Sequence, residues 1–150
     1  IEDKLYTKNL IVNIFDVIIK NKGALIIIDY GQLEENFING NTLQGIIKHK
    51  TSDIFENIGL TDLSSWVNFS DFIKDLPIEI KYQGPITQKE FLINLGIKSR
   101  FENLAKNKSA TERRHLFTQF ERLVSSSHMG QAFKVMILYS ENMKSFEGFK

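Results

Sequence analysis

The tripeptide Asp29-Tyr30-Gly31 is the first group of residues whose types and position could do chemistry. It directly follows an uninterrupted apolar run over residues 24–28. Open α/β sheets place their binding and catalytic groups at the carboxyl ends of such strands. There the Asp29 carboxylate could orient a cation, and the Tyr30 ring could pack against it. The same tripeptide could also be a simple turn that ends the strand.

The other chemistry-bearing residues do not assemble into a motif. His49, His115 and His128 lie far apart and the chain has no Cys, so we expect solvated or structural histidines and no metal site. The adjacent acids Glu34 and Glu35 are typical of a polar loop that faces water. Neither a phosphate-binding glycine loop nor a nucleophile elbow occurs in the sequence. Spacing alone therefore assigns no reaction.

Two short basic clusters, residues 48–50 and 113–115, leave nucleic-acid binding as an alternative. Neither cluster has interleaved aromatic side chains. The formal net charge is only +1, from 19 basic and 18 acidic residues, so no overall field favours nucleic acid or an anionic membrane. We therefore expect no nucleic-acid partner.

The elements around the tripeptide predict an α/β fold. The run 24–28 has no polar alternation, which indicates a strand covered on both faces, as in a parallel sheet between helices. Before this run, apolar residues recur at helical spacing, and Asn21-Lys22-Gly23 is expected to stop the helix. The apolar positions are Leu10, Ile11, Ile14, Phe15, Ile18 and Ile19.

A long polar excursion separates this part from the rest of the chain. Residues 32–61 are irregular and rich in Asn and Gly, apart from a short strand predicted over 42–47. Such excursions are usually functional lids or disordered segments. A helix over 70–76 is then expected to stop before Pro77, and a strand follows over 78–82.

Three helices and a last strand complete the chain. Thr87 and Glu90 have the spacing of a capping box, which predicts a helix beginning there. A second helix is predicted over 98–106. A third begins near Ala110 and should bury a stripe at helical spacing. Its members are Leu116, Phe117, Phe120 and Leu123. The last strand is expected over 132–139.

Length and composition limit the class of protein and the cellular location that we expect. One hundred and fifty residues, 42% of them hydrophobic, can form one domain with a core. No apolar run approaches the roughly 20 residues of a membrane helix, and no secretory signal is evident. The absence of Cys fits a reducing compartment. We expect an intracellular protein, and a start at Ile1 in place of Met suggests a fragment.

Five segments in one order carry a family resemblance. They are Gly23-Ala24-Leu25-Ile26-Ile27-Ile28-Asp29-Tyr30-Gly31; Thr42-Leu43-Gln44-Gly45 with His49-Lys50; Gly59 and Asp62-Leu63 with Val67 and Phe69; Gly84-Pro85-Ile86-Thr87-Gln88 with Phe91-Leu92 and Leu95-Gly96-Ile97; and Met129-Gly130 with Phe133-Lys134-Val135. Together they resemble the carboxyl-terminal half of the MidA-like family of S-adenosylmethionine-dependent methyltransferases. Mitochondrial members of that family are complex I assembly factors that symmetrically dimethylate arginine.

The resemblance implies the carboxyl-terminal portion of a class I, Rossmann-like α/β methyltransferase. Its sheet has seven strands, of which the last is antiparallel. Residues 23–31 would form the fifth strand with its D-Y-G turn, residues 32–77 a lid-like insertion, and residues 78–139 the sixth and seventh strands with the intervening helices.

In the family's strand order the fifth strand lies between the fourth and the seventh. The outer edge beside residues 25–28 would then carry unpaired backbone groups, which is a pairing and aggregation hazard. We therefore expect a complementing amino-terminal half or self-association.

The resemblance also implies a site. Two carboxylates would bind the guanidinium of an arginine, and a histidine would accept its proton. The matching positions are Asp29, Asp62 and His49 for catalysis and Tyr30, Gly31 and Phe69 for substrate binding. The cofactor loop and the ribose-binding acid belong to the amino-terminal half of the family. This chain alone is therefore not expected to bind S-adenosylmethionine tightly.

The matching region departs from the family at the lid. The family has a His-Val-Asp-Phe run where this chain has Trp66-Val67-Asn68-Phe69, and a Pro-Gly where it has Ile58-Gly59. The loss of a His and a carboxylate should change how the lid handles a substrate.

We therefore predict the carboxyl-terminal part of a protein arginine methyltransferase, acting on a respiratory complex I subunit and inactive without its other half. The alternative is a non-catalytic interaction or assembly remnant of such an enzyme. The expected location is the bacterial cytoplasm or, as a second choice, the mitochondrial matrix.

Overall fold

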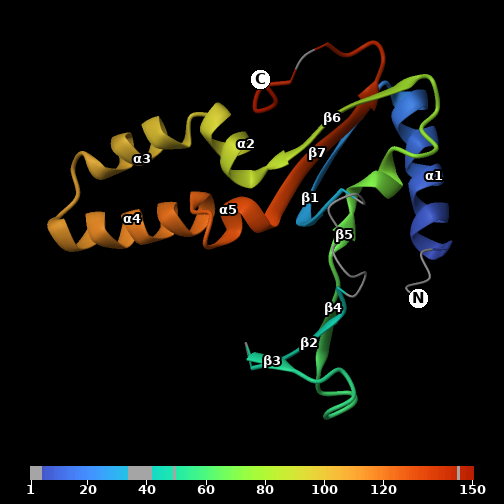
Figure 1. Ribbon diagram of the computed structural model, residues 1–150. Coiled ribbons are helices and arrows are strands. Elements are labelled where there is room, and N and C mark those ends of the chain that lie inside the picture. The colour runs from blue at the N-terminus through green and yellow to red at the C-terminus, as the bar shows by residue number, and fades with distance from the viewer. Residues whose placement is uncertain (1–4, 34–41, 49, 145) are drawn as a thin grey trace.

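A mixed sheet forms the centre of the molecule (Figure 1). The computed structural model describes residues 5–33, 42–48, 50–144 and 146–150. The strand order is β5-β1-β7-β6. Strand β7 is antiparallel to both β1 and β6, whereas β1 and β5 are parallel. The expected antiparallel last strand beside the first is thus confirmed. The bounds are β1 Ala24–Gln32, β5 Val67–Asn68, β6 Ile80–Thr87 and β7 Phe133–Ser140.

The strand that is covered on both faces is β7 and not β1. Every residue from Val135 to Ser140 is buried. In β1, by contrast, Leu25 and Ile27 pack against the core, while Ile26 and Ile28 are each 52% exposed. The prediction of a first strand buried on both faces is therefore wrong for the described residues. A continuous apolar run shows that both faces of a strand are suited to burial. Here only one face of β1 packs against another element.

Helix α1 (Leu5–Asn21) covers that one face. Phe15 and Ile18 are buried there against Met136 and Leu138 of β7. The helix ends where it was predicted to end, because the Gly23 amide donates to the carbonyl of Ile18 at 2.9 Å. No helix in the described part of the chain is long and apolar enough to cross a membrane.

The polar excursion contains a second, small sheet, which we call the β arm (residues 42–65). Its strand order is β3-β2-β4, and it projects away from the main sheet (Figure 1). The bounds are β2 Gln44–Ile47, β3 Lys50–Ser52 and β4 Asp62–Ser64. The short strand expected over 42–47 is confirmed as β2, whereas β3 and β4 were not anticipated. Glu34 and Glu35 lie outside the described residues.

Two boundaries after the arm differ from the prediction. In place of an α-helix over 70–76, a single 3-10 turn (η2, Phe69–Phe72) forms, because Asn68 caps it and the chain turns again before Pro77. Strand β6 does not end at residue 82, as predicted, but continues to Thr87. The register shifts between Gln83 and Ile86, and this bulge accommodates a proline that cannot donate to the ladder.

Four helices lie between β6 and β7. The predicted capping box is present, since the Thr87 hydroxyl accepts from the Glu90 amide while the Glu90 carboxylate accepts from the Thr87 amide. Helices α3 and α4 form a hairpin that extends away from the sheet (Figure 1). The bounds are α2 Gln88–Asn94, α3 Ile97–Ala105, α4 Ala110–Val124 and α5 Met129–Ala132.

Candidate functional site

The carboxyl end of β1 is formed by a close approach of two backbones. The strand continues through Asp29 and Tyr30 to Gln32, so the tripeptide is part of the strand and not a turn. Gly31 pairs with Val67 and Gln32 pairs with Asn68 in β5. A Cβ atom at Gly31 would lie 2.0 Å from the Val67 carbonyl oxygen. Glycine is therefore required at this position by the β1–β5 pairing.

Asp29 lies in a row of polar residues that crosses the sheet. Its cross-strand partner is Lys134 of β7, and Lys134 also pairs with Thr87 of β6. Directly paired residues share one face of a sheet. The carboxyl ends of β1 and β6 and the amino end of β7 thus place these three side chains side by side. The row places the Asp29 carboxylate and the Lys134 ammonium at one edge, whereas the Thr87 hydroxyl is held in the capping box with Glu90.

Lys134 is the member of this row that sequence reasoning missed. Burial lowers the pKa of the Lys134 ammonium, and the nearby Glu90 carboxylate acts in the opposite direction. The Lys134 Nζ atom donates to the carbonyl of Gln131. The signal that could have found it is a lysine inside the apolar run of residues 133–139, because lysine is rarely buried without a partner.

Tyr30 belongs to the opposite face of the sheet. It pairs with Phe133, and the two rings meet edge to face with centroids 5.7 Å apart. Successive residues of a strand point to opposite faces, so Asp29 and Tyr30 do not share one. The structure thus brings both residues to the same strand end but does not stack the Tyr30 ring over a cation held by Asp29 on one face.

The other predicted site residues lie elsewhere. Asp62 is exposed at the start of β4, where it pairs with Ile46 in the β arm. Phe69 has no exposed surface and packs with Phe15 and Ile18 in the core. His49 lies outside the described residues.

Asn68, a position where the sequence resemblance leads us to expect an Asp, has a structural role. Its Oδ1 atom accepts from the Ser70 amide and its Nδ2 atom donates to Asp71, each at 3.1 Å. An aspartate at this position could accept from Ser70 but would place a second carboxylate beside Asp71. The Asn68 side chain, which could have contacted a substrate, caps η2 instead.

No cluster of three metal-ligating side chains exists among the described residues. A cofactor cradle is also absent from this part of the chain. Gly31 is closed off by the Val67 carbonyl, and no described helix opens on a glycine-rich turn after a strand. The described residues therefore do not fit the nucleoside of S-adenosylmethionine, whose ribose commonly lies beside such a turn.

One protein-family model matches more than half of the chain. The family model described as "Putative S-adenosyl-L-methionine-dependent methyltransferase" matches residues 6–86. Among curated proteins, the mitochondrial protein arginine methyltransferase NDUFAF7 of Danio rerio is 33% identical over 117 residues, which is 78% of this chain and 27% of that protein. The human protein of that name is 30% identical over 117 residues, 77% of this chain and 26% of its own. The chain thus spans about a quarter of the length of these relatives.

Two solved structures share the fold. A protein of Burkholderia thailandensis superimposes with a TM-score of 0.80 at 22% identity, covering 94% of this chain and 38% of that one. A second member of its superfamily from the same organism, bound to S-adenosyl-homocysteine, gives a TM-score of 0.68 at 24% identity and covers 84% and 34%. The fold is therefore a portion of a Rossmann-like α/β sheet of the methyltransferase type, as expected.

Proposed function

The chain belongs to this family of S-adenosyl-L-methionine-dependent methyltransferases, and from that premise we propose that it is the acceptor-binding part of a protein arginine methyltransferase. The MidA-like resemblance predicted from five sequence segments is confirmed at the level of the family. The observation that supports the acceptor role is the carboxylate of Asp29 at the carboxyl end of β1, beside the Lys134 and Thr87 side chains.

The chemistry asks the acceptor site for binding and orientation. A guanidinium must be held close to the methyl donor, and it loses a proton as the new N–C bond forms. We assign cation binding to Asp29. The same proposal keeps Asp62 as a second cation-binding carboxylate and His49 as the proton acceptor, and Tyr30 and Gly31 shape the strand end. Because the described residues do not fit the cofactor, no step is assigned to it here.

A complementing segment would supply what these residues lack. The edge of β1 that faces away from β7 is paired only at Gly31 and Gln32 among the described residues. We propose that an amino-terminal half of the enzyme adds a strand there and brings the cofactor site. A respiratory complex I subunit is the proposed substrate. The proposed location is a bacterial cytoplasm or a mitochondrial matrix.

The test is a chimera in which the 117 matching residues of this chain replace the corresponding region of the Danio rerio relative. Calorimetry with S-adenosylmethionine reports cofactor binding, and labelled methyl transfer to arginine peptides, with lysine peptides as the control, reports activity. Asp29→Asn should lower transfer by about tenfold to a hundredfold, because a charge-assisted hydrogen bond is lost, and leave cofactor affinity unchanged. Asp16→Asn, an exposed position on α1, is the charge-matched control.

A non-catalytic interaction module is the second candidate, and it is favoured by the capping role of Asn68. A folded chimera that binds the cofactor and transfers no methyl group supports this module. A folded chimera that does not bind the cofactor removes the enzyme proposal.

A further inference from the structure

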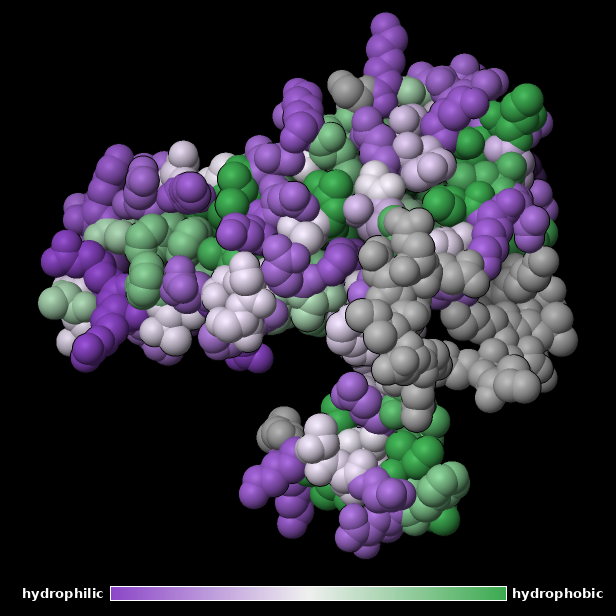
Figure 2. Space-filling view, viewed as in Figure 1, coloured by the Kyte–Doolittle hydropathy of each residue, from purple (hydrophilic) through white to green (hydrophobic). Residues whose placement is uncertain are grey.

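The α3–α4 hairpin carries apolar surface that its two helices do not cover. The rings of Phe101, Phe117 and Phe120 form a cluster, with centroids 6.1 Å apart for Phe101 and Phe117 and 5.1 Å apart for Phe101 and Phe120. Phe117 nevertheless remains 50% exposed and Leu104 47% exposed. In Figure 2 this hydrophobic surface lies among hydrophilic side chains along the hairpin.

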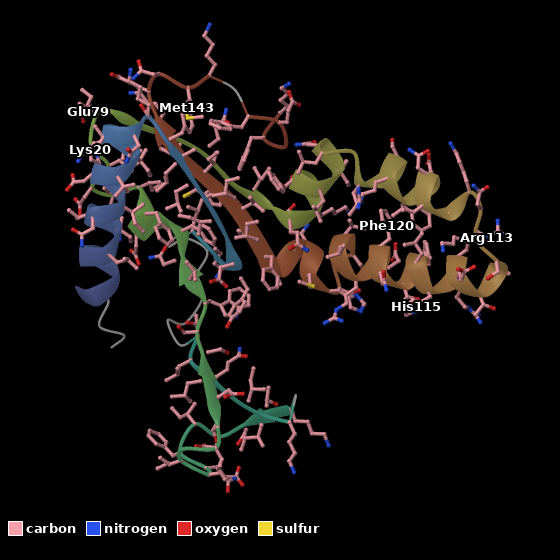
Figure 3. The ribbon with its side chains drawn as sticks, turned by 180° about the vertical axis from the view of Figure 1, so that it is seen from behind. Lys20, Glu79, Arg113, His115, Phe120 and Met143 are labelled. Carbon is pink, nitrogen blue, oxygen red and sulfur yellow. The ribbon has the colours of Figure 1, made fainter. Side chains whose placement is uncertain are left out.

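The buried stripe predicted for α4 is therefore only half formed. Val124 at the base of the helix is buried, and Leu116 and Phe120 are partly covered, but Phe117 and Leu123 are exposed. Seen from behind, Phe120 lies between the helices and Arg113 lies at the far tip (Figure 3). A two-helix hairpin has one internal seam, so an apolar stripe wider than that seam stays open to a third element.

The hairpin also concentrates the positive charge of the chain. Residues 97–124 contain seven basic and three acidic side chains, a surplus of four, whereas the whole chain has a surplus of one. The rest of the chain is therefore negative by three. All seven basic residues are exposed. They are Lys98, Arg100, Lys106, Lys108, Arg113, Arg114 and Arg122.

One of the three acidic side chains is already paired within the hairpin. Glu112 accepts from the Ser109 amide and hydroxyl and forms an ion pair with Lys108 at 3.0 Å. The arginines at positions 100, 113, 114 and 122 form no ion pair within the described part of the chain. The surface thus combines uncovered apolar side chains with unneutralised guanidinium groups.

We propose that the α3–α4 hairpin is a docking surface for an acidic amphipathic helix of a partner protein. The apolar side of such a helix would cover Phe117 and Leu104, and its carboxylates would meet Arg113 and Arg114. Binding of this kind places an apolar helix face into an apolar groove, with charges at the rim that set specificity. A nucleic acid would match the charge and could stack a base on Phe117, but it would leave the aliphatic side chain of Leu104 uncovered.

The first measurement uses three synthetic peptides with the full 150-residue chain. One is an amphipathic helix with Leu and Phe on one side and Glu on the other. The second has the same composition in scrambled order, and the third replaces Glu with Lys. Fluorescence anisotropy should show binding of the first alone. Its affinity should fall about threefold or more between 50 and 300 mM NaCl, because rim charges are screened by salt.

The second measurement separates charge from apolar contact. Arg113→Glu with Arg114→Glu should weaken binding by about tenfold or more, since two attractive rim charges become repulsive. Lys81→Glu with Lys144→Glu makes the same change in net charge at exposed positions outside the hairpin, and it should leave the affinity within about twofold. Phe117→Ser, at a half-exposed position, should weaken binding by about fivefold or more. Circular dichroism checks that each variant is folded.

Three results would overturn the proposal. They are equal affinity for the amphipathic and scrambled peptides, an equal loss in the two charge-reversed double variants, and displacement of the peptide by a short RNA duplex that binds more tightly. All three read binding alone, so they are independent of methyl transfer.

Discussion

At the scale of single residues, the carboxylate of Glu112 has the clearest electrostatic setting. The Ser109 backbone amide, the Lys108 ammonium and the Ser109 hydroxyl all donate to it, and together they lower the pKa of Glu112 from 4.5 to about 2. The side chain is exposed, so these donors and not burial set the shift. The charge is thereby fixed at the first turn of α4, where the helix dipole favours it.

We therefore expect Glu112 to titrate far below an ordinary glutamate. Because the folded pKa is depressed, its contribution to stability is complete above about pH 4.5 and fades as the pH falls toward about 2. Carboxyl resonances followed by NMR should place the Glu112 midpoint near 2, and Ser109→Ala should raise it. The difference in melting temperature between the wild type and Glu112→Gln should shrink across the same pH range. A midpoint near 4.5 contradicts this expectation.

Thr87 and Glu90 form the same kind of capping box at the start of α2 as Ser109 and Glu112 form at α4. Its hydroxyl accepts from the Glu90 amide at 3.1 Å, and the Glu90 carboxylate returns to the Thr87 amide at 2.9 Å. Thr87→Ala should lower the free energy of unfolding by about 1 kcal/mol, measured by urea denaturation at fixed protein concentration. Thr111→Ala, at an exposed position in the first turn of α4, is the control and should change it by less than about 0.5 kcal/mol. Equal effects in the two variants would exclude the cap as the cause.

At the scale of elements, the contact between β1 and β5 depends on one missing side chain. Gly31→Ala places a methyl group against the Val67 carbonyl, so the strands must separate or the backbone must shift. We expect a loss of about 2 kcal/mol in the free energy of unfolding. In Gly23→Ala the new methyl lies 3.9 Å from the nearest atom, the Cα of Ile18, and makes an ordinary contact. A loss of the same size in both variants would contradict the close approach.

The elements that were predicted correctly are those with their signals close together in the sequence. The stop of α1 at Gly23 and the capping box at Thr87 are each written in a few consecutive residues. The two strands of the β arm that were not predicted, β3 and β4, are only three residues long and carry no alternation to detect. The continuation of β6 past Pro85 depends on a β-bulge, and no pattern in the neighbouring residues predicts this bulge.

The candidate site could likewise be predicted only where its signals lie close together in the sequence. Asp29 could be placed at a strand end from its own neighbourhood, and period-two alternation could already have separated it from Tyr30. That Lys134 would lie opposite Asp29 depends on the pairing of β1 with β7, which joins distant parts of the chain. The burial of Phe69 depends on packing against α1 and could not be read from its flanking residues.

At the scale of the whole molecule, the apolar edge of β1 should govern association. Ile26 and Ile28 are half exposed beside a backbone edge that is unpaired from Ala24 to Tyr30 among the described residues. Such an edge pairs readily with another strand. We expect the isolated chain to elute from size-exclusion chromatography as a dimer or larger species.

Variants can assign this association to the strand. Ile28→Lys should shift the elution toward a monomer, because a charge on the strand disfavours a second copy. Val12→Lys introduces the same charge at a half-exposed apolar position of α1 and should leave the elution unchanged. A well-behaved monomer in the unmodified chain would remove the idea.

The central position of β7 in the sheet also determines when β1 gains a partner strand during translation. Strand β1 pairs along its length with residues 133–139, about a hundred residues later in the chain. At ~5–20 residues per second of translation, β1 leaves the ribosome some 5–20 seconds before the strand that will cover it. During that interval the edge of β1 that β7 will cover has no partner strand. That edge is therefore most exposed to chaperones, and to mispairing, before β7 is made.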